Sequence, residues 1–211
     1  MYGRSPIMKK LLLTSGGLTD NLKELFWKTI NKAPSDTKIL FIPSAATESD
    51  GAREGISMCI YKLMEMGIRS QNIFTYNLKF LLSKGYRRTY STEVSHLPKE
   101  FRLLTAEELK EFDAVICGSG NAALLVEELN RTGFDTILQQ AVKEGLLYIG
   151  ISAGSMAAAG NFAAGLHFIE NPLTVHCEQG TTCGEIKGDG HIRLTDEQAI
   201  WIEDSCSHVI A

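Results

Sequence analysis

One short stretch of the sequence carries the residue pattern of a nucleophile for acyl transfer. In LLYIGISAGSMAAAG, Ser152 separates an apolar run from a run of small residues and is the centre of a Gly-x-Ser-x-Gly motif. Where a strand turns sharply into a helix, this motif presents the serine hydroxyl at the end of the sheet. The backbone N–H of the next residue, Ala153, and the helix N-terminus can then stabilise an oxyanion. A buried core hydroxyl is the alternative interpretation of the same serine.

A glycine-rich loop after another apolar run is predicted to face this serine. The carboxyl ends of parallel strands share one edge of a sheet, so the loop reaches Ser152 if the two strands are neighbours. Its backbone N–H groups would then help to bind the oxyanion, although an ordinary glycine-rich turn is the alternative. Dinucleotide binding is disfavoured, because the G-x-G-x-x-G pattern fails at Ala123. The loop residues are Gly118, Ser119, Gly120 and Asn121.

A serine nucleophile needs a general base, and the chain has five histidines. His176 in NPLTVHCEQG ends a short apolar run ahead of a turn, which is a good position from which to present an imidazole. We therefore favour His176, while the residues alone leave the other four open. Those four are His96, His167, His191 and His208.

Length, charge and composition narrow the class of protein. The chain has 211 residues, 44% of them hydrophobic, which suits one domain spanning residues 1–211. A net charge of −4 argues against a general nucleic-acid binder. No apolar run approaches the roughly 18 residues of a membrane span, and the N-terminal stretch lacks a long hydrophobic signal region. Five cysteines, an odd number, are more typical of reduced thiols than of disulfides. We therefore expect a cytoplasmic protein without a membrane or nucleic-acid partner.

Strand-like and helix-like segments alternate over the first two thirds of the chain. Runs such as ILFI at 39–42 are unbroken, as in strands that are buried on both faces. Thr105 and Glu108 form the pattern of a helix capping box. The alternation predicts an α/β fold with a mostly parallel sheet flanked by helices. The predicted strands begin near residues 10, 38, 72, 113 and 146, and the predicted helices cover 20–30, 51–67, 105–112, 121–133 and 134–145.

Two regions depart from this alternation. Residues 79–102 form a long, weakly periodic stretch of mixed charge, which we predict to be an irregular excursion. Such a connection can be a lid, a binding loop or a surface flap without function. After Gly160, short strand-like runs separated by turn residues replace the alternation; these runs are LTVHC, IRLT, AIWIED and SHVIA.

Five motifs, taken in order, carry a resemblance to a known family. FIPSAA, CGSGNAALL, YIGISAGS, NPLTVHC and LTDEQAIWI together resemble peptidase family S51, which includes aspartyl dipeptidase (peptidase E) and cyanophycinase. The resemblance extends from about Lys10 to Glu203, and YIGISAGS is its most specific part. It implies a fold similar to class I glutamine amidotransferases, of the flavodoxin-like type, with short extra strands near the C-terminus.

The resemblance also implies roles for individual residues. It assigns the nucleophile to Ser152, the oxyanion loop to GSGN, the histidine to His176 and the orienting acid to Asp196. The adjacent Glu197 is a second carboxylate in the same turn, and the residues alone do not choose between the two. The implied reaction is hydrolysis of a peptide bond in small peptides, with acidic dipeptides as a candidate class and with no cofactor or metal. A homodimer is left open.

The chain departs from the family pattern at two points. Ser119 occupies the middle of an oxyanion loop that is usually G-G-G-N or G-G-G-D, and Ser152 and His176 are only 24 positions apart. The short spacing reduces a segment that helps to define the substrate in the dipeptidases. The short spacing therefore argues against aspartyl specificity more than against hydrolysis. In addition, the sequence does not identify a single basic residue that would bind an acidic side chain of the substrate.

Three other functions are alternatives. An amidase of the glutamine amidotransferase type is disfavoured, because it would use a cysteine where this chain has Ser152. A silent binding or regulatory module that kept the turn but lost turnover fits the same sequence. A zinc site is the third, although its residues are spaced more loosely than usual zinc ligands; they are His176, Cys177, Cys183 and His191. We interpret Cys117, beside the loop, as a buried small apolar residue and not as a second nucleophile.

Overall fold

The computed structural model describes residues 9–46, 50–89 and 94–211. The N-terminal stretch 1–8 and residues 90–93 of the predicted excursion lie outside the described residues. Within the described part, no helix combines the length and the apolar character that crossing a membrane would need.

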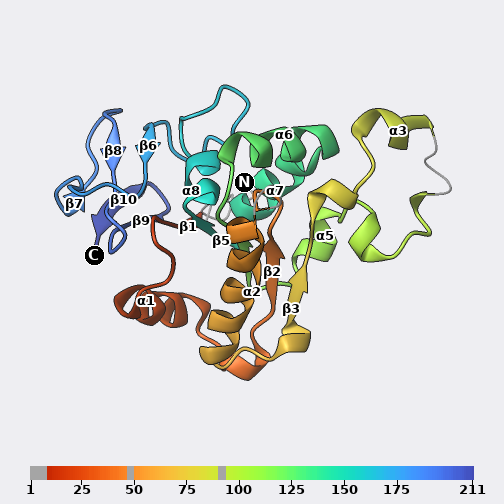
Figure 1. The fold of residues 1–211 in the computed structure, drawn as a ribbon, viewed down its shortest axis with the longest axis horizontal. Coiled ribbons are helices and arrows are strands. Elements are labelled where there is room, and N and C mark those ends of the chain that lie inside the picture. Colours follow the sequence, from red (N-terminus) through yellow and green to blue (C-terminus); the bar gives the residue numbers. More distant parts are fainter. Residues whose placement is uncertain (1–8, 47–49, 90–93) are drawn as a thin grey trace, which may run out of the picture.

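An eight-stranded sheet forms the centre of the fold, in the order β3-β2-β4-β5-β1-β9-β10-β7. The first five strands in this order pair in parallel, and the other three pair antiparallel. The prediction of a mostly parallel sheet is therefore confirmed (Figure 1). The parallel strands are β3 (Ile73–Thr75), β2 (Ile39–Ile42), β4 (Ala114–Cys117), β5 (Leu147–Ile151) and β1 (Lys10–Thr14); the antiparallel strands are β9 (Ala199–Glu203), β10 (Cys206–Ile210) and β7 (Gly184–Glu185).

Burial explains the sequence pattern of the central strands. Every residue of β2 and β4 is buried, because helices cover both faces of the sheet. Such strands need apolar side chains on both faces, which is why their sequences do not alternate. On the other side of the sheet, β9 lies antiparallel to β1, with Ala199 opposite Thr14. This pairing brings the C-terminal segment to the end of β1.

Helices cover the two faces of the sheet in separate layers. On one face, Leu22 and Phe26 of α1 and Leu63 of α2 belong to one apolar core. On the other face, Leu125 of α6 and Leu138 of α7 belong to a second core. Figure 1 shows α1 and α2 below the sheet and α6, α7 and α8 above it. The bounds are α1 (Asp20–Ile30), α2 (Asp50–Glu65), α5 (Ala106–Leu109), α6 (Ala122–Thr132), α7 (Phe134–Lys143) and α8 (Ala153–Ala158).

Local signals in the sequence correctly predict several helix ends. The Thr105 side chain accepts a hydrogen bond from Glu108 N, and the Glu108 side chain accepts one from Thr105 N, so the predicted capping box is confirmed. Gly133 ends α6 with φ 77°, a left-handed conformation that glycine adopts without steric cost. Short 3₁₀ turns lie at η1 (Pro34–Asp36) and η2 (Ser70–Asn72).

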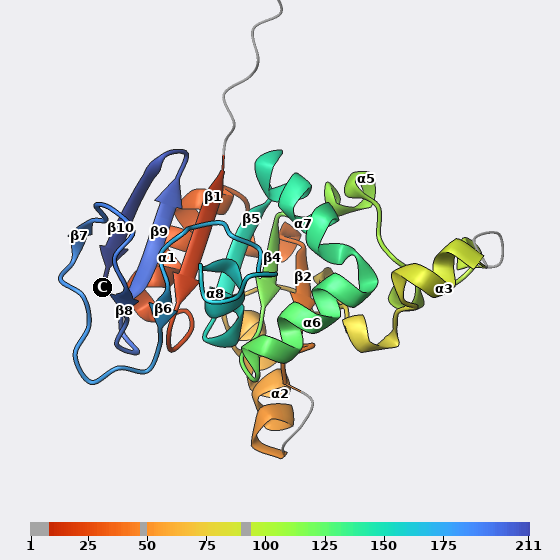
Figure 2. The same ribbon diagram turned by 90° about the horizontal axis from the view of Figure 1, so that it is seen from above.

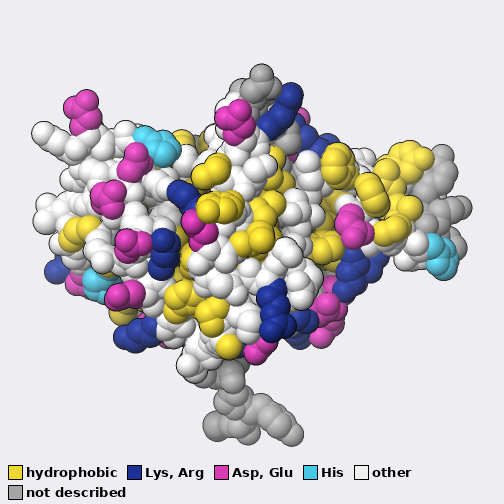
Figure 3. Space-filling model, turned by 60° about the horizontal axis from the view of Figure 1, so that its bottom comes forward, with side chains coloured by type: hydrophobic (Ala, Val, Ile, Leu, Met, Phe, Trp, Pro, Cys, Tyr) yellow, Lys and Arg dark blue, Asp and Glu magenta, His cyan; other side chains and the backbone are white. Residues whose placement is uncertain are grey.

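Helix α2 is unusually exposed for its length. Leu63 is buried, whereas Met58, Tyr61 and Met64 are 52%, 54% and 46% exposed. Figure 3 shows hydrophobic side chains gathered over the middle of the face that carries this helix. The inner side of α2 is therefore the part of the helix that contacts the rest of the chain.

The predicted excursion contains short helices and projects from one end of the molecule. Its described parts include η3 (Leu78–Phe80), α3 (Lys84–Thr89) and η4 (Lys99–Phe101). Figure 2 shows α3 at the end opposite β7 and β10. Helix α3 is therefore far from the carboxyl end of β5 and does not cover it.

The C-terminal part forms short strands, as the sequence predicts. β6 (Leu173–Thr174) and β8 (Ile192–Arg193) make a separate two-stranded parallel sheet. β7 was not predicted, because its two residues are both exposed and lack an apolar pattern.

Candidate active site

Ser152 lies at the sharp turn between β5 and α8, at the carboxyl edge of the sheet. Its backbone has φ 51° and ψ −103°, a conformation that is rare for a residue with a side chain. The flanking glycines are needed for steric reasons. A Cβ at Gly150 would lie 2.6 Å from Ser155 N, and one at Gly154 would lie 2.1 Å from Cys117 O. The motif therefore forms the strand–turn–helix arrangement that the sequence predicts.

The turn is held to β1 by hydrogen bonds through Thr14. The Thr14 carbonyl accepts from Ser152 N at 3.0 Å and from Ser155 Oγ at 2.7 Å. The Thr14 hydroxyl donates to Gly150 O at 3.1 Å. Ser155 and Thr14 are fully buried, so these bonds are shielded from water. This anchoring maintains the unusual backbone conformation at Ser152.

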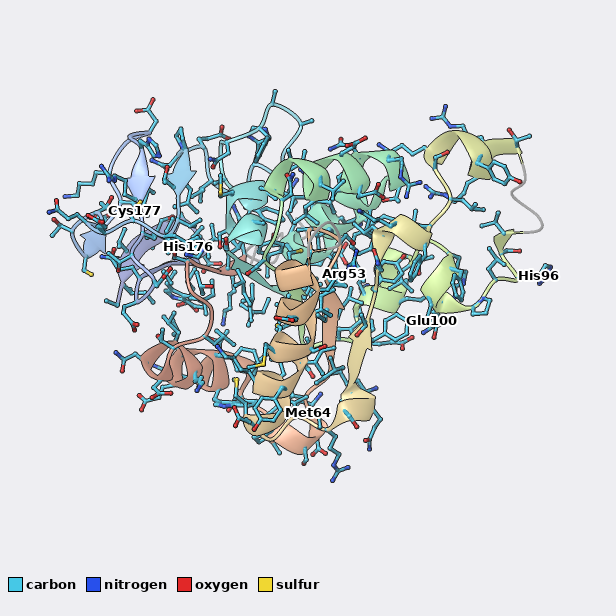
Figure 4. The ribbon with its side chains drawn as sticks, viewed as in Figure 1. Arg53, Met64, His96, Glu100, His176 and Cys177 are labelled. Atoms are coloured by element: carbon cyan, nitrogen blue, oxygen red, sulfur yellow. The ribbon has the colours of Figure 1, made fainter. Side chains whose placement is uncertain are left out.

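Side chains from three distant segments meet at the turn. His176 Nε2 lies 2.9 Å from Ser152 Oγ, and His176 Nδ1 lies 2.6 Å from Asp196 Oδ1. When Nδ1 carries the ring proton and donates it to Asp196, Nε2 is left to accept the hydroxyl proton of Ser152. Figure 4 shows His176 beside Cys177, toward the end of the molecule that carries the C-terminal strands.

The three side chains differ in their exposure. Ser152 is 9% exposed, whereas the side chains of His176 and Asp196 are 52% and 61% exposed. The hydrogen bond with His176 is the main cause that holds the pKa of Asp196 below its ordinary value; slight burial opposes this shift and a bond from Ser15 adds to it. Asp196 is therefore a carboxylate at neutral pH, and a substrate can approach the imidazole from solvent.

Ser15 joins this group, although the sequence analysis did not select it. Its hydroxyl donates to Asp196 Oδ1 at 3.0 Å and accepts from His176 N at 2.7 Å. His176 has a positive φ of 57°, so the second bond holds a strained backbone in position. The available signal was a small polar residue at the end of the first predicted strand, at the same edge of the sheet as Ser152.

The structure separates the two adjacent carboxylates. Asp196 forms the hydrogen bond to His176, and among the described residues no hydrogen bond or ion pair joins Glu197 to that ring. Asp196 Cβ also lies 3.0 Å from the position that a Cβ on Gly16 would take, so a glycine there makes room for the aspartate. The spatial arrangement thus favours Asp196 as the carboxylate next to the imidazole.

The glycine-rich loop after β4 lies beside Ser152, because β4 and β5 are neighbours. Two of its expected oxyanion donors are already used. Gly118 N donates to Ile42 O at 3.0 Å, and Asn121 N donates to Ala45 O at 2.9 Å. The Asn121 side chain accepts from Leu124 N and caps α6. The expectation that Gly118 and Asn121 donate to the oxyanion is therefore corrected, since backbone bonds already occupy their N–H groups.

Three backbone N–H groups are left as candidate oxyanion donors. Within the described ranges, no acceptor is found for the N–H of Ser119 or Gly120. Ala153 N is the first N–H of α8, and the first N–H groups of a helix have no partner within the helix. Gly120 has φ 131°, and a Cβ there would lie 2.1 Å from Ala45 O, so only glycine fits at this position.

The other histidines and cysteines lie in different environments. His191 Nε2 lies 2.7 Å from Thr174 Oγ1, His208 is in β10, and His96 lies at the far end of the molecule from His176 (Figure 4). Among the described residues, no group of three or more His, Cys, Asp or Glu side chains is arranged to hold a metal ion. All five cysteines are free, and burial raises the pKa of the Cys117 thiol to about 12, in agreement with its interpretation as an apolar residue.

Sequence comparisons match parts of the chain. Residues 82–168 match the model of peptidase family S51. An uncharacterized peptidase from Pasteurella multocida is 38% identical over 55 residues, which make up 26% of this chain and 27% of that protein. Peptidase E of Streptomyces coelicolor is 49% identical over 51 residues, 24% of this chain and 21% of that protein. The chain thus matches about a quarter of the length of these curated relatives.

The likeness to solved structures extends over the whole chain. A candidate peptidase E from Listeria monocytogenes EGD-e superposes with a TM-score of 0.62 at 20% sequence identity, covering 96% of this chain and 98% of that one. This likeness concerns the fold, and it agrees with the predicted class I glutamine amidotransferase-like architecture. In the match of residues 82–168 and in the relatives named as peptidases, the chain is similar to peptidase family S51.

Proposed function

We propose that this protein is a serine-type peptidase that hydrolyses a peptide bond in small peptides. The main support for the proposal is the chain of hydrogen bonds that links Ser152, His176 and Asp196 at the carboxyl edge of the sheet. The match of residues 82–168 to the model of peptidase family S51 supports the same reaction class. The cysteine-dependent amidase is disfavoured, because the residue at the turn is a serine.

In the first half of the reaction, Ser152 Oγ attacks the carbonyl carbon of the scissile bond. His176 Nε2 takes the hydroxyl proton as the new C–O bond forms, and Asp196 stabilises the imidazolium by accepting from Nδ1. The carbonyl oxygen becomes an oxyanion, which the N–H of Ala153 and those of Ser119 and Gly120 are available to stabilise. The intermediate then collapses, the C–N bond breaks, and the amine leaves with the proton from Nε2.

In the second half, water replaces the amine beside His176. The imidazole removes a proton from water as the hydroxide oxygen attacks the ester carbonyl of the acyl-enzyme. Collapse of the second tetrahedral intermediate breaks the bond to Ser152 Oγ, and His176 returns the proton to that oxygen. The products are a carboxylate and an amine, and the exposure of His176 gives water access to the site.

Two measurements on the full chain test this proposal. Purified protein is treated with a fluorophosphonate probe, and the labelled residue is identified by peptide mass spectrometry. The same preparation is incubated with a set of dipeptides and tripeptides, and release of free amine is measured. We expect a stoichiometric label on Ser152 and hydrolysis of at least part of the set. Intact protein that neither labels nor hydrolyses any peptide would indicate the silent binding module instead.

A further inference from the structure

A cavity of about 250 Å³ adjoins the candidate oxyanion loop, on the face of the sheet that α1 and α2 cover. Ile151, the residue directly before Ser152, forms part of its wall. Gly118, Ser119 and Gly120 of the loop form another part. The cavity therefore lies next to the position where a substrate carbonyl would be held.

The side chains around the cavity are mostly apolar. They include Phe41, Ile56, Met58, Leu63, Met66 and Ile116. Cys59 also lines the cavity, and burial raises the pKa of its thiol to about 11, so it is a neutral group there. No acidic side chain is found among the described residues of the wall. Two cationic side chains, those of Lys23 and Lys62, also line the cavity. Lys23 Nζ forms an ion pair with Asp20 Oδ1 at 2.9 Å.

Two glycines of α2 help to keep this space open. Gly51 and Gly55 line the cavity, and a Cβ added at either would have no atom within 4 Å. Glycine destabilises the interior of a helix relative to alanine. The two glycines therefore lower the stability of α2 and leave space between this helix and the sheet.

The position of the cavity indicates which side of the substrate it would receive. The leaving amine must lie beside His176, because that imidazole donates its proton to it. The wall of the cavity is built from residues 16–151, and the segment carrying His176 and Asp196 contributes none of it within the described part. The cavity is thus on the acyl side of the scissile bond. Pockets for drug-sized ligands are roughly 300–1,000 Å³, so this smaller volume suits one large side chain.

We propose that this cavity receives a large apolar side chain on the acyl side of the scissile bond, so that the preferred peptides carry Leu, Met or Phe there. The inference rests on the proposed peptidase function and adds the substrate class. A substrate with Asp at that position would leave its carboxylate among mostly apolar groups. Of the two lysines in the wall, Lys23 is already paired with Asp20, and Lys62 is the other. Burying a charge in such surroundings is unfavourable.

A series of dipeptides that differ only in the first residue tests the inference. Leu-Ala, Met-Ala, Phe-Ala, Ala-Ala and Asp-Ala are compared by kcat/KM on the full-length protein. We expect at least about tenfold higher kcat/KM for the large apolar residues than for Ala, and the lowest value for Asp. Gly55→Leu fills the cavity from α2, and it should lower the Leu-to-Ala and Phe-to-Ala ratios by about tenfold or more.

A matched control distinguishes occlusion from a general effect of the substitution. Gly85 in α3 also has no atom within 4 Å of an added Cβ and does not line the cavity, so Gly85→Leu should leave both ratios unchanged. Higher kcat/KM for Asp-Ala or Ala-Ala than for the apolar series would overturn the inference, as would ratios unchanged by Gly55→Leu. In either case fluorophosphonate labelling of Ser152 would leave the peptidase proposal standing. Loss of both labelling and hydrolysis would contradict the peptidase proposal and this inference with it.

Discussion

Ser15 Oγ donates a hydrogen bond to Asp196 Oδ1 over 3.0 Å, across 181 positions of the sequence. The same carboxylate oxygen accepts from His176 Nδ1, and the same hydroxyl accepts from His176 N. Ser15 is fully buried at the end of β1, whereas Asp196 is exposed. The buried end of β1 therefore positions two exposed groups, the carboxylate and the imidazole.

We expect Ser15→Ala to lower kcat by about tenfold to a hundredfold, because small displacements of catalytic groups have effects of that size. Ser44→Ala is the matched control. Ser44 is also fully buried, follows β2 and accepts a hydrogen bond from Leu78 N at 2.8 Å. Both variants should lower Tm by similar amounts, and only Ser15→Ala should also slow fluorophosphonate labelling of Ser152. Equal labelling rates in the two variants would restrict Ser15 to a role in stability.

Ser152→Ala and His176→Ala should each abolish turnover without unfolding the protein. The first removes one hydroxyl and leaves the backbone bonds to Thr14 in place, and the second removes a ring that is half exposed. Because members of one catalytic unit are not additive, the double variant should lose little more activity than either single variant. The measurements are kcat/KM for the three variants and Tm for each. Strictly multiplicative losses would show that the two residues act independently.

Asp196→Asn should reduce kcat by several orders of magnitude, since an amide can stabilise the wrong tautomer of His176. Glu197→Gln is the matched control, because it makes the same chemical change at the next position. It should change kcat little, as no hydrogen bond or ion pair between Glu197 and the imidazole is found in the described part of the chain. Steady-state kinetics of both variants check this expectation. The reverse ranking, or two equally mild losses, would remove Asp196 from the proposed triad.

Glu108 should contribute to stability in a defined pH range. Arg102 donates from both terminal nitrogens to its carboxylate, at 2.9 and 2.6 Å, and this bonding lowers the pKa of Glu108 from its ordinary 4.5 to about 2. A depressed folded-state pKa stabilises the protein above the unfolded-state pKa, and the effect is lost as the pH falls toward the folded-state value. Glu108→Gln should therefore lower the free energy of unfolding by roughly 1–2 kcal/mol at pH 7.

Urea unfolding at several pH values measures this contribution. The difference between wild type and Glu108→Gln should be constant above about pH 5 and should shrink as the pH falls from about 4.5 toward 2. Glu107→Gln is the control, since the Glu107 side chain is 80% exposed and pairs only with Lys110 among the described residues. A difference independent of pH would mean that Glu108 acts through packing and not through its charge.

Features that depend on neighbouring residues were predictable from the sequence alone. Continuous apolar runs such as those of β2 and β4 indicate strands buried on both faces, because each face needs its own apolar side chains. The turn at Ser152 was predictable for a similar reason: the two glycines that its close contacts require are within two positions of it. The capping box at Thr105 is likewise encoded within four residues.

The contacts between groups that are far apart in the sequence depend on how the whole chain folds. The strand order β5-β1-β9 brings Asp196 to the ends of β5 and β1. His176 follows β6 of the separate two-stranded sheet, and its bonds to Ser15 and Asp196 hold it beside Ser152. Ser15 acquires its role through a hydrogen bond to a segment far away in the chain. The N–H groups of Gly118 and Asn121 likewise donate to backbone carbonyls of a distant segment, which the sequence does not reveal. Local periodicity reports which face of an element is buried, whereas these contacts are set by how whole elements pack against one another.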